Sequence, residues 1–147
     1  MKSFYKTLII AVAPLFLLSS CSEDENALDT VKPEIILATP NDHADFEFGE
    51  AINLQAILKD NVELGSYKIE IHSDSDGHQH RSSTIGWSFM DTGDISNQKE
   101  YLLNKTIPIP TGEYKEGHYH LGIIVTDKAG NETQSFIEIV IGDDHHH

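Results

Sequence analysis

The sequence contains a single cysteine and a single arginine among its 147 residues. One cysteine excludes a disulfide-stapled scaffold, and the length allows at most one ordinary domain. Ten lysines and arginines oppose 24 aspartates and glutamates, which gives a formal net charge of -14. Nucleic acid is therefore not expected as a partner, because binding it requires clustered basic side chains that displace counterions from phosphates.

The sequence also lacks the common catalytic motifs. It has no Gly-x-Ser-x-Gly elbow, no His-Glu-x-x-His pair and no glycine-rich phosphate loop. An enzyme is therefore not expected. A metal-dependent hydrolase or a copper oxidoreductase stays open as an alternative, because an open site of several histidines can activate water.

Residues 1–20 have the features of a secretory signal peptide. Lys2 and Lys6 precede an apolar run from Leu8 to Leu18 that is too short to span a bilayer. The run ends in Leu18-Ser19-Ser20-Cys21, which resembles the lipobox of bacterial lipoproteins. The resemblance implies that Cys21 becomes a lipidated N-terminus, which would hold the protein on a membrane without a transmembrane helix.

Residues 21–32 are polar and acidic and are expected to form a tether. Within them, residues 22–26 resemble the acidic export signal of surface lipoproteins in Bacteroidota-type bacteria. This resemblance implies an outer-membrane lipoprotein exposed on the cell surface, and a tether that faces the periplasm is the alternative. Residues 29–31 resemble an O-glycosylation acceptor of the same bacteria.

Residues 33–142 are predicted to form an all-β domain. Short runs of alternating apolar and polar residues are separated by turn residues, and no long segment has a helical period. Such a pattern is typical of an immunoglobulin-like antiparallel β-sandwich of about seven strands. The expected strands are residues 34–37, 51–59, 66–72, 87–90, 99–107, 118–126 and 133–141.

Three sequence elements resemble a family of uncharacterised Bacteroidota surface lipoproteins, in which a single immunoglobulin-like domain follows the lipobox. They are residues 59–61 (Lys-Asp-Asn), the His-x-His pairs and residues 127–131 (Asp-Lys-Ala-Gly-Asn). The last element is similar to the turn between strands F and G of bacterial immunoglobulin-like domains, where Asp, Gly and Asn favour a tight turn. The resemblance implies a fold and a location, and no function is assigned to that family.

Nine histidines are the unusual feature of the composition. In the expected sandwich the third and sixth strands are antiparallel neighbours, so the end of one lies beside the start of the other. His72 ends the third strand, while His118 and His120 begin the sixth, and all three alternate with inward-facing apolar residues. His78 and His80 follow in the loop that leaves the same end. These side chains are therefore expected to converge at one pole.

Neutral imidazole is a preferred ligand of zinc and copper, and carboxylates can complete the coordination shell. The sequence thus predicts a transition-metal site for capture or sensing, built from His72, His78, His80, His118 and His120, with Asp74, Asp76 and His43 as additional candidate ligands. Residues 143–147 end in three histidines, which suit either a metal-collecting arm or the remainder of a purification tag.

Two other functions compete with metal binding. The domain could be an adhesion or carbohydrate-binding module with an unknown protein or glycan partner and incidental histidines. Trp87 and Phe89 share a face and would form a sugar platform if exposed, although burial is favoured for a lone tryptophan. The histidine cluster could also sense pH.

Calcium is not expected. Residues 74–77 (Asp-Ser-Asp-Gly) resemble the start of a calcium loop but lack its later ligands, including the glutamate at position 12. A second set of oxygen-bearing side chains is expected at the opposite pole, where turn capping is the favoured explanation. This set contains Asp60, Asn61, Glu63, Asp127 and Asn131.

Overall fold

The computed structural model describes residues 28–73 and 85–142, which fold into eight β-strands. In this part of the chain there is no helix of the length and apolarity that crossing a membrane requires. The strands are β1 (Glu34–Thr39), β2 (Ala44–Phe46), β3 (Ala51–Lys59), β4 (Leu64–Ser73), β5 (Ser88–Asp94), β6 (Glu100–Pro108), β7 (Gly117–Asp127) and β8 (Glu132–Ile141).

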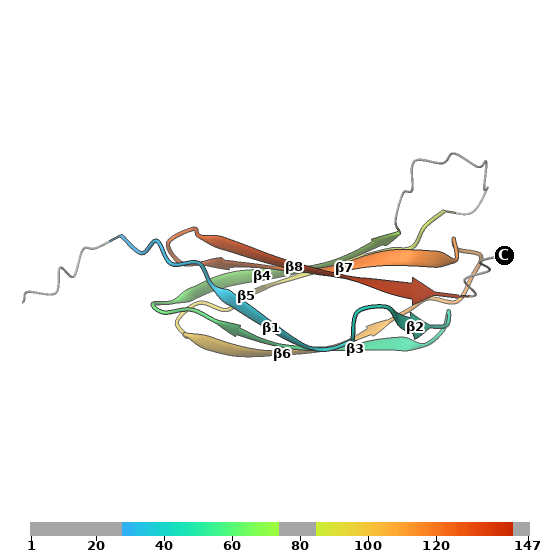
Figure 1. The fold of residues 1–147 in the computed structure, drawn as a ribbon, viewed down its shortest axis with the longest axis horizontal. Coiled ribbons are helices and arrows are strands. Elements are labelled where there is room, and N and C mark those ends of the chain that lie inside the picture. Colours follow the sequence, from blue (N-terminus) through green and yellow to red (C-terminus); the bar gives the residue numbers. More distant parts are fainter. Residues whose placement is uncertain (1–27, 74–84, 143–147) are drawn as a thin grey trace, which may run out of the picture.

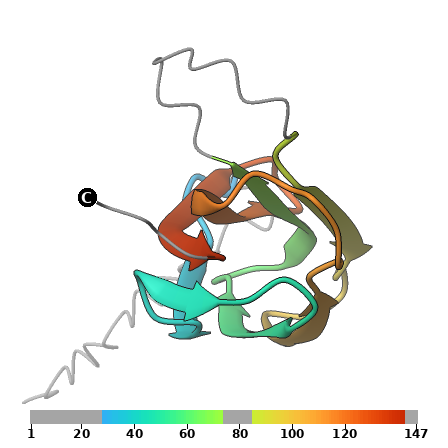
Figure 2. The same cartoon turned by 90° about the vertical axis from the view of Figure 1, so that its right-hand side faces the viewer.

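The strands form two sheets that lie face to face (Figures 1 and 2). One sheet has the order β1-β3-β6, and the other has the order β2-β8-β7-β4-β5. All pairings are antiparallel except that of β2 with β8. This confirms the predicted fold class, an immunoglobulin-like β-sandwich, because the third and sixth expected strands are indeed neighbours in one sheet.

All seven expected strands are present, and two details differ from the prediction. Strand β2 was not predicted, because three residues are too short a run for alternation to indicate a strand. It forms because the loop before it pairs with the edge of β8, where the His43 amide donates to the Glu138 carbonyl at 2.7 Å. Strand β5 continues beyond Met90, because Gly93 allows the Tyr67 ring to lie directly over its backbone.

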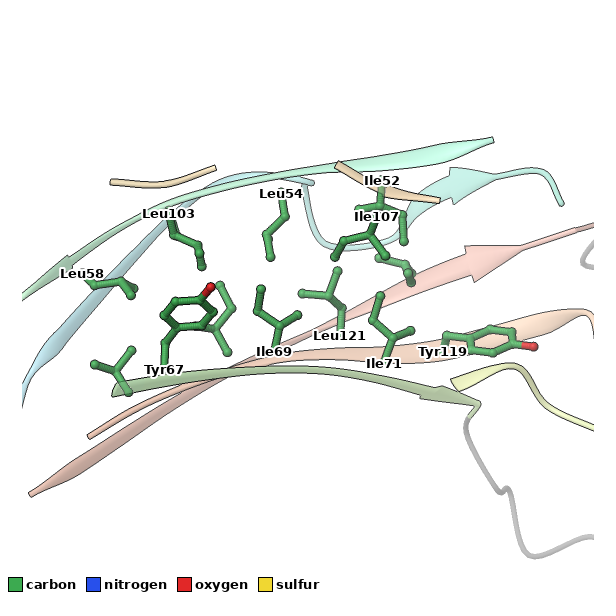
Figure 3. Close-up of a cluster of buried hydrophobic side chains, with 14 of the residues drawn as sticks. Ile52, Leu54, Leu58, Tyr67, Ile69, Ile71, Leu103, Ile107, Tyr119 and Leu121 are labelled. Atoms are coloured by element: carbon green, nitrogen blue, oxygen red, sulfur yellow. The ribbon is translucent and has the colours of Figure 1, made fainter. Parts of the chain in front are cut away.

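The core lies between the two sheets and consists of the inward residues of each alternating strand. Figure 3 shows Ile52, Leu54 and Leu58 of β3 facing residues of β4 and β7 across this layer. Each such side chain contributes about 1.5–3 kcal/mol when it is removed from water. The fully buried apolar residues of β4 and β7 are Leu64, Ile69, Ile71, Tyr119, Leu121, Ile123 and Val125.

The two ends of the sandwich carry different chemistry. β7 spans its length, so Gly117 and Asp127 mark opposite ends roughly 30 Å apart at about 3.3 Å per residue. The end at which β7 begins and β4 ends carries histidines and is called the histidine pole; it faces the viewer in Figure 2. The opposite end holds residues 28–33, 60–63 and 127–131 and is called the tether pole.

The predicted turn at residues 127–131 joins β7 to β8. The Asp127 carboxylate accepts a hydrogen bond from the Asn131 amide at 2.7 Å, and the Asp127 amide donates to the Asn131 carbonyl at 3.0 Å. Gly130 has a φ of 95°, a left-handed conformation that side chains disfavour. The expected roles of Asp, Gly and Asn in this turn are therefore confirmed.

Candidate functional site on the histidine pole

Two histidines and a glutamate lie side by side on three neighbouring strands of the five-stranded sheet. His72 of β4 is opposite His120 of β7, and His120 is opposite Glu138 of β8. The imidazoles of His72 and His120 meet edge to face, with ring centroids 5.5 Å apart. Their strand neighbours Ile71 and Tyr119 are buried, so this row lies on the outer face of the sheet.

The Glu138 carboxylate contacts two further imidazoles. Its Oε1 atom lies 2.8 Å from Nδ1 of His118, which precedes His120 by two residues on the same face of β7. The same oxygen lies 2.9 Å from Nδ1 of His43. We call His43, His72, His118, His120 and Glu138 the histidine face.

The loop before β2 places His43 against Glu138. The Asp42 carboxylate accepts a hydrogen bond from the Glu138 amide at 2.9 Å, which fastens the loop to the edge of β8. His43 itself has a left-handed backbone with a φ of 59°, a conformation in which histidine is enriched among non-glycine residues. A side chain far from His118 in sequence is thus held beside the same carboxylate.

The structure places three of the five predicted ligands, His72, His118 and His120, on one outer face, but no three residues of this face have ligand atoms that all lie within 4.8 Å of one another. It adds His43, which the sequence had offered as an additional ligand. The remaining predicted ligands, His78, His80, Asp74 and Asp76, lie outside the described residues, as do Cys21 and residues 143–147.

The sequence analysis missed Glu138, although a signal for it was present. The turn at residues 127–131 sets the register of β7 against β8, with Thr126 opposite Glu132. Counting outward from that pair places Glu138 opposite His120. A predicted turn therefore identifies cross-strand partners as well as strand ends.

The hydrogen bond from His118 holds the pKa of Glu138 below its usual value. Electrostatic attraction to His118 and His43 lowers this pKa further. The carboxylate is consequently ionised at neutral pH. Four imidazoles and one carboxylate on a single face provide the nitrogen and oxygen donors that zinc and copper prefer.

The lowered pKa predicts how stability depends on pH. The interactions of the Glu138 carboxylate should contribute fully above its ordinary pKa of 4.5 and should be lost as the pH falls through the lower folded value. The Glu138→Gln variant lacks this contribution, so its stability should decline less steeply in acid. Urea unfolding of both proteins in steps from pH 7 to about pH 3 measures the difference. Parallel curves would contradict the prediction.

Trp87 is not available as a sugar platform. It is only 8% exposed and packs against Phe89 and Tyr119, with ring centroids 6.4 and 6.3 Å away. The expectation that this tryptophan is buried is therefore confirmed.

Tyr119 forms a tyrosine corner, in which the hydroxyl bonds back to the main chain upstream, and this feature is characteristic of this class of fold. Its hydroxyl donates to the Lys115 carbonyl four residues upstream and accepts a hydrogen bond from the Trp87 amide at 3.2 Å. Immunoglobulin-like sandwiches place such a tyrosine near the start of strand F, which is β7 here. The sheet order and this corner together define an immunoglobulin or fibronectin type III-like domain.

The chain belongs to the family of domains of unknown function DUF4625, whose sequence profile matches residues 19–142. Among solved structures, it is similar to the fibronectin(III)-like modules of Clostridium thermocellum CbhA, with 17% identity and a TM-score of 0.46. That match covers 80% of this chain and 52% of the other. No curated protein sequence matches the chain.

Proposed function

We propose that this protein is a surface-anchored lipoprotein that binds a divalent transition-metal ion, zinc or copper, on its histidine face. Its role is capture or sensing of the metal outside the cell rather than catalysis. The observation that carries the proposal is the contact of one Glu138 oxygen with both His43 and His118, beside the adjacent pair of His72 and His120.

A small metal ion would require these donor atoms to move closer together, because no three residues of the histidine face have ligand atoms that all lie within 4.8 Å of one another. Nδ1 of His118 and Nδ1 of His43 lie 2.8 and 2.9 Å from Oε1 of Glu138. Ligand atoms around a tetrahedral zinc with bonds of about 2.0 Å are roughly 3.3 Å apart. Binding would therefore require the side chain of His43, which is 66% exposed, to rotate toward His118 around the ion.

The position of the histidine face also supports the proposal. Residues 28–33 reach β1 from the tether pole, so a lipid on Cys21 would attach at the end opposite the histidines. The formal charge of -14 makes the protein attractive to cations. The metal site would then point away from the membrane, toward ions in the surrounding medium.

Thermal unfolding of residues 22–144 with and without Zn²⁺, Cu²⁺ and Ni²⁺ tests the proposal. This segment contains every core residue and omits the final histidines. A ligand that binds only the folded state stabilises it, by about 2.7 kcal/mol at a concentration 100 times its dissociation constant. We expect zinc or copper to raise the midpoint selectively, and we expect the double variant His118→Ala, His120→Ala to abolish the rise.

A pair of matched variants sharpens this test. Glu138→Gln should weaken metal binding, because the carboxylate lies among the imidazoles. Glu70→Gln removes a carboxylate from the same outer face of β4, where Glu70 pairs with Lys68 at 2.9 Å, and should leave metal binding unchanged. No shift with any of these ions, or equal effects of the two variants, would exclude the proposed site.

A second candidate function is an adhesion or carbohydrate-binding module. It is favoured by apolar side chains exposed on the outer face of the five-stranded sheet, where Phe136 lies over Gly122 and Met90 is 69% exposed. Beside them is an open polar hollow lined in part by Lys68, Thr92 and Gln134. Glycan or protein binding that persists in a chelator and is lost in Phe136→Ala would favour this function.

A further inference from the structure

Three carboxylates from separate parts of the chain meet at the tether pole. Asp29 precedes β1, Asp60 lies in the turn between β3 and β4, and Asp127 lies in the turn between β7 and β8. One oxygen from each lies within 4.8 Å of the others. Within residues 28–73 and 85–142, no other three acidic, histidine or cysteine side chains bring ligand atoms this close.

The hydrogen bonds of Asp60 leave one of its oxygens without a donor. Its Oδ2 atom caps the turn by accepting from the amides of Val62 and Glu63, each at 2.8 Å. Its Oδ1 atom is buried and has no hydrogen-bond partner. A buried carboxylate oxygen without a partner is costly, so turn capping does not account for the whole side chain.

In the part of the chain that the structure describes, the neighbouring lysines form no ion pair with these three carboxylates. Lys99 donates to the main-chain carbonyl of Asn61 at 2.8 Å. Lys128 lies 3.7 Å from Glu63, and Lys59 lies 3.2 Å from Glu100. Three like charges therefore lie together, and like charges at this distance repel.

Asp127 is nevertheless held in its charged form. Burial would raise the pKa of Asp127, but hydrogen bonds from the Asn131 side chain and from backbone amides of the turn outweigh burial. The pKa of this carboxyl therefore lies below its usual value, and the group is ionised at neutral pH.

We propose that Asp29, Asp60 and Asp127 bind a calcium ion that fastens the segment before β1 to the two turns. The donors are oxygens, which a hard cation prefers. Ca²⁺ accepts about six to eight oxygens in a flexible geometry, whereas Mg²⁺ demands a near-ideal octahedron, so an irregular set of carboxylates, completed by main-chain carbonyls and water, favours calcium.

Two hydrogen bonds already hold the segment before β1 close to the proposed calcium site. Nδ2 of Asn131 donates to the Asp29 carbonyl at 3.1 Å, and Nδ2 of Asn61 donates to Oδ1 of Asp29 at 3.3 Å. Calcium would thus stiffen the junction between tether and sandwich. The sequence argued against calcium at residues 74–77, which lie outside the described residues, and the site proposed here is a different one.

Calorimetric titration of metal-free residues 22–144 with CaCl₂, together with thermal unfolding, tests the proposal. We expect one calcium per chain with a dissociation constant on the order of 0.1–1 mM, as in extracellular modules. Asp29→Asn should weaken binding about tenfold or more, because the number of charged ligands sets affinity. Glu132→Gln removes the same charge from an exposed position beside the turn and is the matched control.

The midpoint temperatures of thermal unfolding distinguish a role of Asp29 as a calcium ligand from a purely structural role. In chelator, Asp29→Asn should unfold at the same temperature as the unaltered protein or higher, because a repulsion is removed, while in millimolar calcium it should unfold lower. The proposal is overturned by no binding at millimolar calcium, by equal binding to Asp29→Asn, or by an equal shift with MgCl₂. The histidine face lies at the other pole, so His118→Ala should leave calcium binding unchanged.

Discussion

Replacing Leu121 with alanine is expected to lower the free energy of unfolding by about 3 kcal/mol. Leu121 is fully buried on β7, which pairs with both β4 and β8 in the five-stranded sheet. Its side chain points toward the residues of β3 and β6 across the core (Figure 3). The truncation therefore removes apolar contacts and leaves a cavity that neither sheet can easily collapse to fill.

Leu102 provides the matched control for this experiment. It lies on β6 with 66% of its surface exposed, so Leu102→Ala should change stability by no more than about 0.5 kcal/mol. Urea unfolding of both variants gives the comparison, with unchanged slopes showing that only stability differs. Similar losses in the two variants would contradict the assignment of Leu121 to the core.

The Tyr119→Phe variant should lose about 2 kcal/mol of stability, although it removes a single oxygen atom. The hydroxyl joins the Lys115 carbonyl to the Trp87 amide, and Tyr119 is fully buried. Burial also raises the pKa of Tyr119, so the hydroxyl remains protonated and able to donate near neutral pH. Phenylalanine would remove the acceptor of the buried Trp87 amide together with the hydrogen bond to the Lys115 carbonyl, and an unsatisfied buried donor costs more than an ordinary hydrogen bond contributes.

Tyr101→Phe is the matched control for the Tyr119→Phe variant. Tyr101 is half-buried and stacks on Tyr67 with ring centroids 6.0 Å apart, and within the described residues its hydroxyl has no hydrogen bond. Its variant should therefore remain close to the unaltered protein in stability. Trp87 is the only tryptophan, so its fluorescence reports directly on the corner during unfolding. Equal effects of the two substitutions would show that the Tyr119 hydroxyl has no special role.

The two proposed metal sites would give the two ends of the molecule different roles. At the tether pole, calcium would hold the incoming segment through hard carboxylate oxygens. At the histidine pole, imidazole nitrogens would select a softer transition metal. Since the two donor sets differ in kind and lie at opposite ends of β7, each can be removed by mutation without disturbing the other.

Much of the sandwich could be predicted from the sequence because strand formation follows local alternation. Residues 51–59 were predicted as a strand with the bounds that the structure shows. The outward direction of His72, His118 and His120 followed from the buried residues between them, since side chains alternate across a strand. The end of β5 was less predictable, because residues 92–94 have the composition of a turn and are ordered by pairing with β4.

The sequence by itself determined the alternation of the strands, the turn at residues 127–131 and the common pole of His72 and His120. These features depend on period, turn chemistry and the order of strands in one class of fold. Only the tertiary structure decided that His43 meets Glu138 and that Asp29 meets Asp60 and Asp127. Their partners are distant in sequence, and no local pattern records a contact made when two remote loops close over the ends of the sheets.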